Sequence, residues 1–404
     1  MIAVIGATGT VGREIVAQLR EQRIGVLAVT RNPAAAGLPA GVEVRPGDLT
    51  DPESLESAIG DGVPAAFLVW PFTDPGQAAR LAPEVVAVLA RRTPRIVYLS
   101  AQAAAADPDS FWARVERAIE DSGVQWTFLR PTGFATNTRM WAEQIRSGVV
   151  RWPYGAAVRS LIHERDIAAV AVAALTQDGH RGLRYLLTGP EAISQADQVR
   201  IIGEEAGHPV RWQELPPAQA TDQLAAAWGD RAFAEHAMAS WARMAAEPEP
   251  VTSVVAEVTG VPARTFREWA RDHRDEFRLP TTAEVAQRYA HAFRTGDLDA
   301  ALALLSPGVV RAAPIEAADG PGELHGVQAI MDNSAALNAG LRFHSVEVGD
   351  PFVRGDQFAV RFAFDQTYLP TGRHQTAVKM SLCTVADGAI VREEVYYHTP
   401  RHSS

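Results

Sequence analysis

Cysteine is almost absent from the sequence, which contains only Cys383 among its 404 residues. A single cysteine excludes an intramolecular disulfide and any cysteine-based metal cluster. The sequence also has no apolar run near the ~20 residues that a membrane-spanning helix requires, and no basic region or cleavage site of a signal peptide at its start. These absences predict a soluble protein of the reducing cytoplasm that has no membrane partner.

Excess positive charge is absent as well. The formal net charge is −10, whereas a nucleic-acid partner requires a basic face that can bind phosphates. Lys379 is the only lysine in the sequence, so arginine supplies nearly all of the positive charge. His325 and His344 complete no metal-ligand spacing. We therefore expect no nucleic-acid partner and no metal, but a small-molecule ligand held at local basic positions.

The first third of the sequence alternates short apolar runs with segments of helical periodicity. Residues 11–21 and 77–90 carry apolar side chains at helical spacing, and the alternation predicts βαβ units around a parallel sheet. The ligand edge of such a sheet lies at the carboxyl ends of its strands. The expected strands are residues 2–5, 25–30, 42–45, 65–70, 96–100 and 126–130.

Three glycines stand between the first expected strand and the helix that follows it, in Ile5-Gly6-Ala-Thr-Gly9-Thr-Val-Gly12. Gly6 permits the tight turn, Gly9 lets the backbone approach a pyrophosphate, and Gly12 lets helix and strand pack closely. The helix N-terminus then offers free N–H groups to the anion. The candidate cofactor contacts of this turn are Gly6, Thr8, Gly9, Thr10, Val11 and Gly12.

The second expected strand is followed by Arg31, where an NAD-binding site would normally place an acidic residue for the ribose hydroxyls. An arginine can pair bidentately with a 2′-phosphate, which favours NADP(H) over NAD(H). The alternative is a solvated surface arginine. Asp48 follows the third strand and is a candidate for the adenine side of the site, with a plain turn aspartate as its alternative.

A domain boundary is expected between residues 279 and 280, because Leu279-Pro280 interrupts the chain and Thr281 with Glu284 forms a capping box. An internal turn is the alternative. Two helical segments, residues 284–293 and 297–305, then precede long alternating strands. In each of three expected strands, alternate residues share one face. These residues are at positions 358, 360, 362 and 364 in the first strand, 380, 382 and 384 in the second, and 391, 393, 395 and 397 in the third. The pattern predicts an α+β cone over residues 280–404, after an α/β domain with a small substrate lobe over residues 1–279.

Several segments of the first domain together resemble the NmrA-like, atypical short-chain dehydrogenase/reductase family. The resemblance covers residues 1–278 and implies an NADP(H)-binding Rossmann fold, found in quinone reductases, other small-molecule reductases and redox sensors without turnover. It implies that Pro71, Phe72 and Ser100 line the nicotinamide and that a segment including Phe134 and Asn137 borders the substrate. The segments are Ile5-Gly6-Ala-Thr-Gly9-Thr-Val-Gly12, Val29-Thr-Arg31-Asn-Pro33, Trp126-Thr-Phe-Leu-Arg130-Pro-Thr-Gly-Phe134, Ile162-His163-Glu-Arg-Asp166-Ile167-Ala168 and Leu187-Thr-Gly-Pro-Glu-Ala-Ile-Ser194.

The Tyr-x-x-x-Lys pair of ordinary short-chain dehydrogenases, which hands a proton to the carbonyl oxygen, is missing. The only lysine, Lys379, lies far outside the first domain. The proton must therefore come from water or from another side chain such as His163, whose alternative role is packing before a helix. Quinones and conjugated enones suit such a site, because hydride addition leaves a stabilised anion that water can protonate.

Residues 282–400 resemble the SnoaL-like group of the nuclear transport factor two superfamily, in segments such as Gly296-Asp297-Leu-Asp299, Thr371-Gly-Arg373 and Asp387-Gly388. The resemblance implies a cone with a mostly apolar pocket, which relatives use as cyclases, isomerases, hydrolases or dimerisation modules. A homodimer through the cone is accordingly expected. The candidate groups for proton abstraction are Asp365, Glu394 and His398, with Tyr396 as a hydrogen-bond donor to the substrate, and solvated strand positions are the alternative for each.

These patterns favour a bacterial NADPH-dependent reductase of a quinone, enone or polyketide-like molecule in secondary metabolism, with a cone that binds or further converts the substrate. One alternative is an NADP(H)-sensing regulator that does not turn over its cofactor. The other is a cyclase or isomerase in which the first domain is a scaffold.

Overall fold

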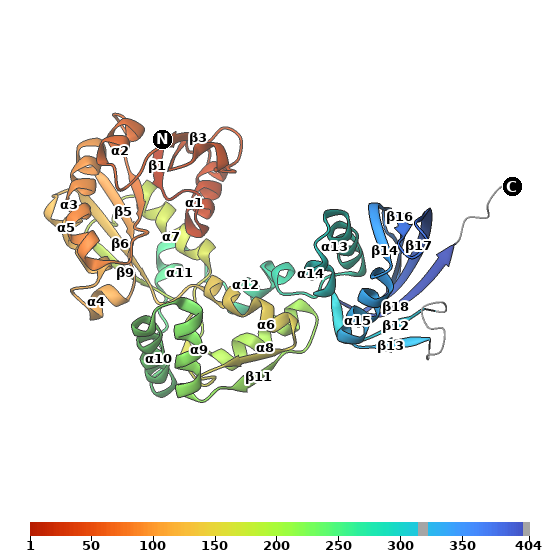
Figure 1. Cartoon of the computed structure of the whole chain (residues 1–404). Helices are drawn as coiled ribbons and strands as arrows, with labels where there is room; N and C mark the ends of the chain where they lie inside the picture. The colour runs from red at the N-terminus through yellow and green to blue at the C-terminus, as the bar shows by residue number, and fades with distance from the viewer. Residues whose placement is uncertain (314–321, 399–404) are drawn as a thin grey trace. The chain divides into compact units, whose positions relative to one another are not determined.

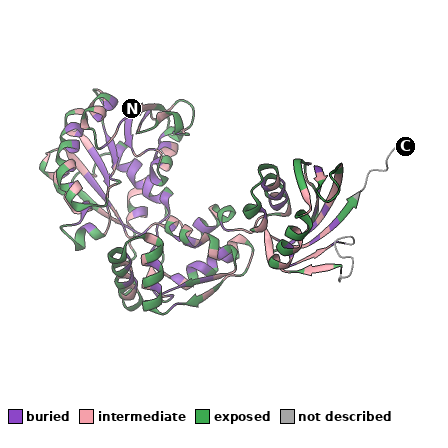
Figure 2. Ribbon diagram, viewed as in Figure 1, coloured by how far each residue is buried: buried purple, intermediate pink, exposed green. Residues whose placement is uncertain are grey.

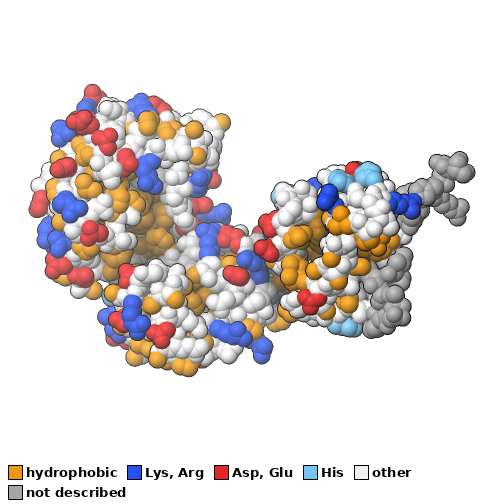
Figure 3. Space-filling view, in the orientation of Figure 1, with side chains coloured by type: hydrophobic (Ala, Val, Ile, Leu, Met, Phe, Trp, Pro, Cys, Tyr) orange, Lys and Arg blue, Asp and Glu red, His pale blue; other side chains and the backbone are white. Residues whose placement is uncertain are grey.

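The computed structural model describes residues 1–313 and 322–398. The chain divides into two compact units, Met1–Arg278 and Leu279–Ser404 (Figure 1). Among the described residues, no helix combines the length and the apolar character needed to cross a membrane. Acidic and basic side chains are interspersed on the face of each unit that Figure 3 shows.

The first unit is built on a sheet of seven parallel strands in the order β3-β2-β1-β4-β5-β6-β9. The central strands are apolar and buried on both faces, as a parallel sheet covered by helices requires. This is the expected doubly wound fold, extended by a seventh strand that the sequence reading did not include. The strands are β1 (Ile2–Ile5), β2 (Val26–Thr30), β3 (Glu43–Pro46), β4 (Ala66–Val69), β5 (Arg95–Leu99), β6 (Gln125–Pro131) and β9 (Leu183–Leu187).

Helices cover both faces of this sheet. One face packs against α1 and α7, and the other packs against α2, α3 and α5, so that two separate apolar cores lie on either side of the strands. Figure 2 shows the buried strands between helices whose outer faces are exposed. The elements of this layer are α1 (Thr10–Glu21), η1 (Pro33–Ala35), α2 (Pro52–Ile59), α3 (Pro75–Arg92), α4 (Ala103–Ala106), α5 (Phe111–Asp121), α7 (Glu164–Thr176) and α11 (Val254–Thr259).

The rest of the first unit forms a smaller lobe with its own aromatic core, in which Trp141, Trp152, Trp241 and Trp269 are buried. It includes two short two-stranded pairings, β8 with β10 and β7 with β11. The lobe consists of η2 (Ala135–Trp141), α6 (Ala142–Arg146), β7 (Val149–Trp152), β8 (Val158–Arg159), β10 (Ile193–Ser194), α8 (Gln195–Ala206), β11 (Arg211–Glu214), α9 (Pro217–Trp228), α10 (Arg231–Ala246), α12 (Phe266–Asp272) and η3 (Arg274–Glu276).

The second unit is a curved sheet in the order β13-β12-β18-β17-β16-β14, with β15 paired to β16, that packs on α13. The capping box of Thr281 and Glu284 is present and begins α13. The second helix is shorter than expected, since α14 ends at Leu302 and Leu305 already begins β12. The elements are α13 (Thr282–Thr295), α14 (Leu298–Leu302), β12 (Leu305–Ala312), β13 (Glu323–His325), α15 (Val327–Asn338), β14 (Leu341–Val348), β15 (Phe352–Arg354), β16 (Gln357–Tyr368), β17 (Arg373–Ala386) and β18 (Ala389–His398).

Candidate functional site

The glycine turn joins β1 to α1, and each of its glycines is needed for a different reason. Gly6 has a φ of +90°, a left-handed conformation that side chains disfavour. A Cβ atom at Gly12 would lie 2.1 Å from the carbonyl oxygen of Gly6, so only glycine lets helix and turn approach this closely. A Cβ at Gly9 would meet only that same oxygen, at 3.4 Å, which leaves the outer side of Gly9 open to a ligand.

The N-terminus of α1 is free to bind an anion. Gly9 is its N-cap, no side chain caps it, and its first turn contains no acidic residue. The N–H groups at such an end have no partner within the helix and carry the positive end of the helix dipole. Thr8 is half-buried and Thr10 exposed, whereas Val11 is buried in the apolar core, so only its backbone is available to a ligand. The turn therefore fits the pyrophosphate of a dinucleotide.

Arg31 is exposed immediately after β2, and its positive charge acts on the nearby carboxylate of Asp48. Asp48 accepts hydrogen bonds from the backbone N–H and the hydroxyl of Thr50, at 2.8 and 2.9 Å. The backbone hydrogen bond from Thr50 holds the pKa of Asp48 below its ordinary value, and Arg31 lowers this pKa further. The Asp48 carboxylate thus already serves a turn, while the Arg31 side chain extends into solvent.

Arg13 was not identified from the sequence, although it organises this corner. Its guanidinium donates to the carbonyl oxygens of Thr8, Ala36 and Gly37, each at 2.9 Å. These bonds connect the glycine turn to the loop that follows η1. The sequence signal was an arginine directly after the third glycine of the turn.

Ser100, at the end of β5, belongs to a buried charged group. Its hydroxyl donates to the carboxylate of Glu116 at 2.5 Å, and Arg130 of β6 binds both oxygens of the same carboxylate. Ser100 and Glu116 are 3% and 4% exposed. At the end of the neighbouring strand β4, Pro71 is exposed, while Phe72 is half-buried and packs edge-on against a tryptophan. The carboxyl ends of β4 and β5 therefore carry the expected residues, with Glu116 and Arg130 as additional members that sequence reasoning missed.

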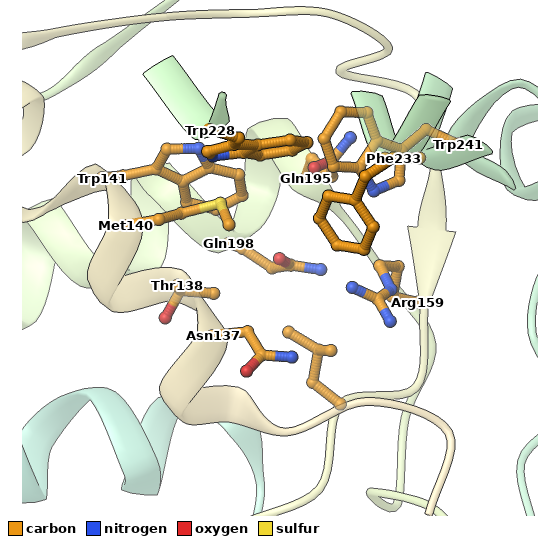
Figure 4. A pocket seen from close by; sticks show the side chains of 12 residues that line it. Asn137, Thr138, Met140, Trp141, Arg159, Gln195, Gln198, Trp228, Phe233 and Trp241 are labelled. Atoms are coloured by element: carbon orange, nitrogen blue, oxygen red, sulfur yellow. The ribbon is translucent and has the colours of Figure 1, made fainter. Parts of the chain in front are cut away.

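A pocket of about 340 Å³ lies in the smaller lobe, between η2, β8, α8, α9 and α10 (Figure 4). Asn137 is in its wall, whereas Phe134 packs against the core of the sheet instead. Most of the lining comes from four segments that are far apart in the sequence, which is why spacing did not reveal it. The aromatic side chains at residues 228, 233 and 241 were the available signal. The lining residues are Asn137, Thr138, Met140, Trp141, Arg159, Leu161, Gln195, Gln198, Trp228, Phe233, Ala237 and Trp241.

His163 caps α7, since its Nδ1 accepts the backbone N–H of Arg165 at 3.2 Å. It is 1% exposed and belongs to a buried cluster with Glu164 and His273. The carboxylate of Glu164 accepts from His273 Nε2 at 2.7 Å and from Trp269 Nε1 at 3.1 Å. His163 does not line the pocket of Figure 4.

The ligand atoms of His163, Glu164 and His273 lie within 4.8 Å of one another. Glu164 and His273 already form hydrogen bonds that a metal ion there would have to displace, whereas His163 Nε2 is buried without a hydrogen-bond partner among the described residues. Burial would raise the pKa of Glu164, but the neighbouring His163 and the hydrogen bond from His273 outweigh it and hold this pKa far below its ordinary value. Burial likewise opposes the charged form of His273, yet Glu164 and Glu276 raise its pKa. The cluster is thus an ion-pair network joining α7 to α12 and η3.

In the second unit, the buried carboxylate belongs to Glu393 and not to Glu394. Strand alternation turns Glu393 toward α13, where it is 0% exposed and accepts hydrogen bonds from Tyr289 and Ser381 at 2.9 and 2.8 Å. Arg311 donates to it at 2.9 Å, and the ammonium of Lys379 lies 3.9 Å away. Burial would raise the pKa of Glu393, but the charges of Lys379 and Arg311 lower it to about 2.

Of the candidates expected in the cone, Asp365, Glu394 and Tyr396 occupy the opposite side of the sheet. Glu394 accepts from Arg392 and from the hydroxyl of Tyr396, which is itself exposed. Asp365 forms an ion pair with His374 at 2.5 Å. The side chain of His398 lies outside the described residues. The available signal for Glu393 was its position between the apolar residues 391 and 395, on the side of the strand that faces the core.

The glycine turn, the absence of acidic residues from the first turn of α1 and the strand order of the first sheet are typical of a dinucleotide-binding fold, and comparison with known proteins agrees. Residues 6–178 match the model of the family described as NAD(P)H-binding, and residues 286–393 match the model of the SnoaL-like domain. A reductase from Streptomyces griseus that acts on (4-alkanoyl-5-oxo-2,5-dihydrofuran-3-yl)methyl phosphate is 36% identical over 69% of this chain and 99% of its own length. This chain belongs to the NAD(P)H-binding, NmrA-like oxidoreductase family.

Two further relatives lie in the same family. The NAD(P)H azoreductase of Xenophilus azovorans is 36% identical over 69% of this chain and 99% of its own length. The NADPH-dependent quinone oxidoreductase of Escherichia coli, solved in complex with NADPH, is 26% identical with a TM-score of 0.58, over 67% of this chain and 99% of that chain. Since each covers about two thirds of this chain, the SnoaL-like unit is an addition to an otherwise whole reductase fold.

Proposed function

We propose that this chain is an NADPH-dependent reductase whose acceptor is a quinone or a conjugated enone. The proposal rests on two features of the first unit. One is the glycine turn followed by α1, whose first turn has no acidic residue, and the other is a pocket lined by Trp141, Trp228 and Trp241. Tryptophan faces suit flat conjugated molecules. The named relatives reduce an azo compound, a quinone and an unsaturated oxofuran, and all three are conjugated acceptors.

The residues of the chain would bind and orient the reactants and leave protonation to water. The nicotinamide supplies a hydride when it is bound. A conjugated acceptor that gains this hydride becomes a delocalised anion, and one proton from water completes the two-electron reduction. His163 is 1% exposed and does not line the pocket, so we do not assign it the role of proton donor.

A preference for NADPH over NADH is assigned to Arg31. Its exposed position after β2 is where a 2′-phosphate would lie, and a bidentate pair there would strengthen binding. Replacement of Arg31 by Ala should weaken NADPH by about tenfold or more and leave NADH nearly unchanged, because a charge-assisted hydrogen bond contributes about 1.5–3 kcal/mol. Equal losses for both cofactors would contradict this assignment.

The test of the reductase uses the full chain and follows loss of NADPH absorbance without oxygen, with quinones, conjugated enones and simple ketones as acceptors. A Gly9→Asp variant is the sharpest negative control. Gly9 has extended backbone angles that any residue adopts, and aspartate is a favoured N-cap, so the fold should persist while the carboxylate repels the pyrophosphate. Turnover that survives in this variant would count against the proposal, and NADPH binding without any turnover would favour a sensor.

For the cone we propose binding and shaping of a substrate, in a pathway of secondary metabolism, with pairing of two chains through this unit. A carboxylate with a pKa of about 2, held by two cations, is a poor proton acceptor, which argues against Glu393 as a general base. The molar mass in solution tests the dimer. Isomerisation of a reduced product by the Gly9→Asp variant would instead favour a catalytic cone.

A further inference from the structure

The pocket of Figure 4 has two chemically different sides. In Figure 4, the side chains of Met140, Trp141, Trp228, Phe233 and Trp241 lie along one side of the cavity with Gln195 beside them, while Asn137, Gln198 and Arg159 lie along the other side. An aromatic wall alone would accept any flat molecule of the right size. The polar side must therefore decide which of these molecules binds best.

Arg159 is the only charged residue among the described residues that line this pocket. Its side chain is 17% exposed, and its Nε atom is buried without a hydrogen-bond partner among the described residues. A terminal nitrogen lies 3.6 Å from Glu249, which is beyond hydrogen-bond distance. The other oxygen of Glu249 accepts the backbone N–H of Ser160. The guanidinium is thus held in place by a loose ion pair and keeps donors for a ligand.

Gly133 makes room for this guanidinium. A Cβ atom at position 133 would lie 2.3 Å from a terminal nitrogen of Arg159, and the backbone there is not in the left-handed region. An alanine would be tolerated by the backbone and would displace the flexible end of Arg159. The position of the cation in the pocket therefore depends on the absence of a side chain from the neighbouring loop.

The neighbouring polar groups are already committed to the protein. Gln198 donates to the carbonyl oxygen of Ile193 at 2.9 Å, Gln195 donates to that of Tyr154 at 2.9 Å, and Thr138 donates to that of Ala135 at 2.7 Å. These side chains are buried and fixed. The donors of Arg159 are consequently the strongest fixed attraction for a ligand in this cavity.

We propose that the pocket selects flat conjugated acceptors that carry an anionic group, namely a carboxylate, sulfonate or phosphate, and that Arg159 binds this group. The proposal rests on the proposed reductase function, since it names the substrate class of the same site. The aromatic side chains cover the conjugated ring, and the guanidinium pairs with the oxyanion in a partly desolvated position, where such a pair is strongest. Arg159 is a specificity residue and takes no part in hydride or proton transfer.

The test compares naphthoquinone with naphthoquinone sulfonate as acceptors for the full-length protein. The sulfonate changes the intrinsic reactivity of the ring, so the relevant quantity is the ratio of the two kcat/KM values, compared between variants. We expect Arg159→Gln to lower this ratio by about 10- to 100-fold, the range of a charge-assisted hydrogen bond. Gly133→Ala should also lower this ratio of kcat/KM values. Rising salt should lower the ratio in the wild-type protein only.

Arg231→Gln is the matched control. It removes one positive charge from the same lobe, but Arg231 is exposed, pairs with Asp222 and Glu235, and does not line the cavity. The ratio of the kcat/KM values for the two quinones should stay at the wild-type value in this variant. An unchanged ratio in Arg159→Gln, with wild-type circular dichroism, would overturn the proposal while the reductase function stands.

A binding measurement keeps the two proposals separate. Three tryptophans line the pocket, so its occupation should quench tryptophan fluorescence. Naphthalene sulfonate should bind at least about tenfold more tightly than its neutral methyl analogue, and Arg159→Gln should remove this difference. If neither quinone is reduced, turnover of the other acceptors decides the proposed function, and this affinity ratio alone decides the inference, with equal affinities counting against it.

Discussion

Replacement of Glu393 by Gln should destabilise the second unit by about 3 kcal/mol. The substitution keeps the volume but removes a fully buried charge that Arg311 and Lys379 contact. A pKa lowered from 4.5 to about 2 corresponds to about 3 kcal/mol in favour of the ionised form. Removal of one partner from a buried ion pair costs a similar ~3–5 kcal/mol, since the other charge is left uncompensated.

The sequence allows the two units to be observed separately during unfolding. All nine tryptophans lie at or before residue 269, so tryptophan fluorescence reports only on the first unit. Far-ultraviolet circular dichroism reports on both units. With a slope of about 1–3 kcal/mol per molar urea, Glu393→Gln should shift the cone transition by about 1–3 M and leave the fluorescence transition in place.

The matched control is Glu394→Gln, the same substitution one residue further along β18. Glu394 is half-exposed, and its partners Arg392 and Tyr396 lie on the other side of the sheet, so the expected change is below about 1 kcal/mol. Equal shifts for both variants would refute the assignment of Glu393 to the core. The folded-state pKa of Glu393 is depressed, so its stabilisation is present above its ordinary value of 4.5. The effect of Glu393→Gln should therefore shrink as the pH falls from 4.5 toward 2.

Three further predictions concern the glycine turn, the buried histidine cluster and the helix cap of the cone. Gly12→Ala places a Cβ atom 2.1 Å from the Gly6 carbonyl oxygen, and isothermal titration should show at least about tenfold weaker NADPH binding. His273→Gln should lower the unfolding free energy of the first unit, followed by fluorescence, by about 1–2 kcal/mol near pH 6 and by less near pH 9. The reason is that Glu164 and Glu276 raise the pKa of His273, so its stabilisation is lost as the pH rises through that value; an effect that grows with pH would contradict this. Thr281→Ala should cost the cone about 1 kcal/mol through loss of its helix cap, and a shift of the fluorescence transition would count against it.

The short-range features could be predicted from the sequence because neighbouring residues determine them. The glycine turn requires Gly6 and Gly12 for reasons of local backbone geometry, and the capping box of Thr281 is read directly from two residues three positions apart. Apolar runs likewise located the strands of the first sheet to within one or two residues. The seventh strand, β9, was missed because its edge position leaves its first residues exposed and its pattern weak.

Contacts between distant residues were decided only by the tertiary structure. His163 meets His273 across 110 positions of the sequence, and the pocket combines Asn137, Arg159 and Trp241 from separate elements. In the cone, the apolar residues 391 and 395 indicated the side of the strand on which Glu393 lies, but not the partners that it meets there. Tyr289, Arg311 and Lys379 come from other elements, and only the packing of the sheet on α13 brings them to one carboxylate.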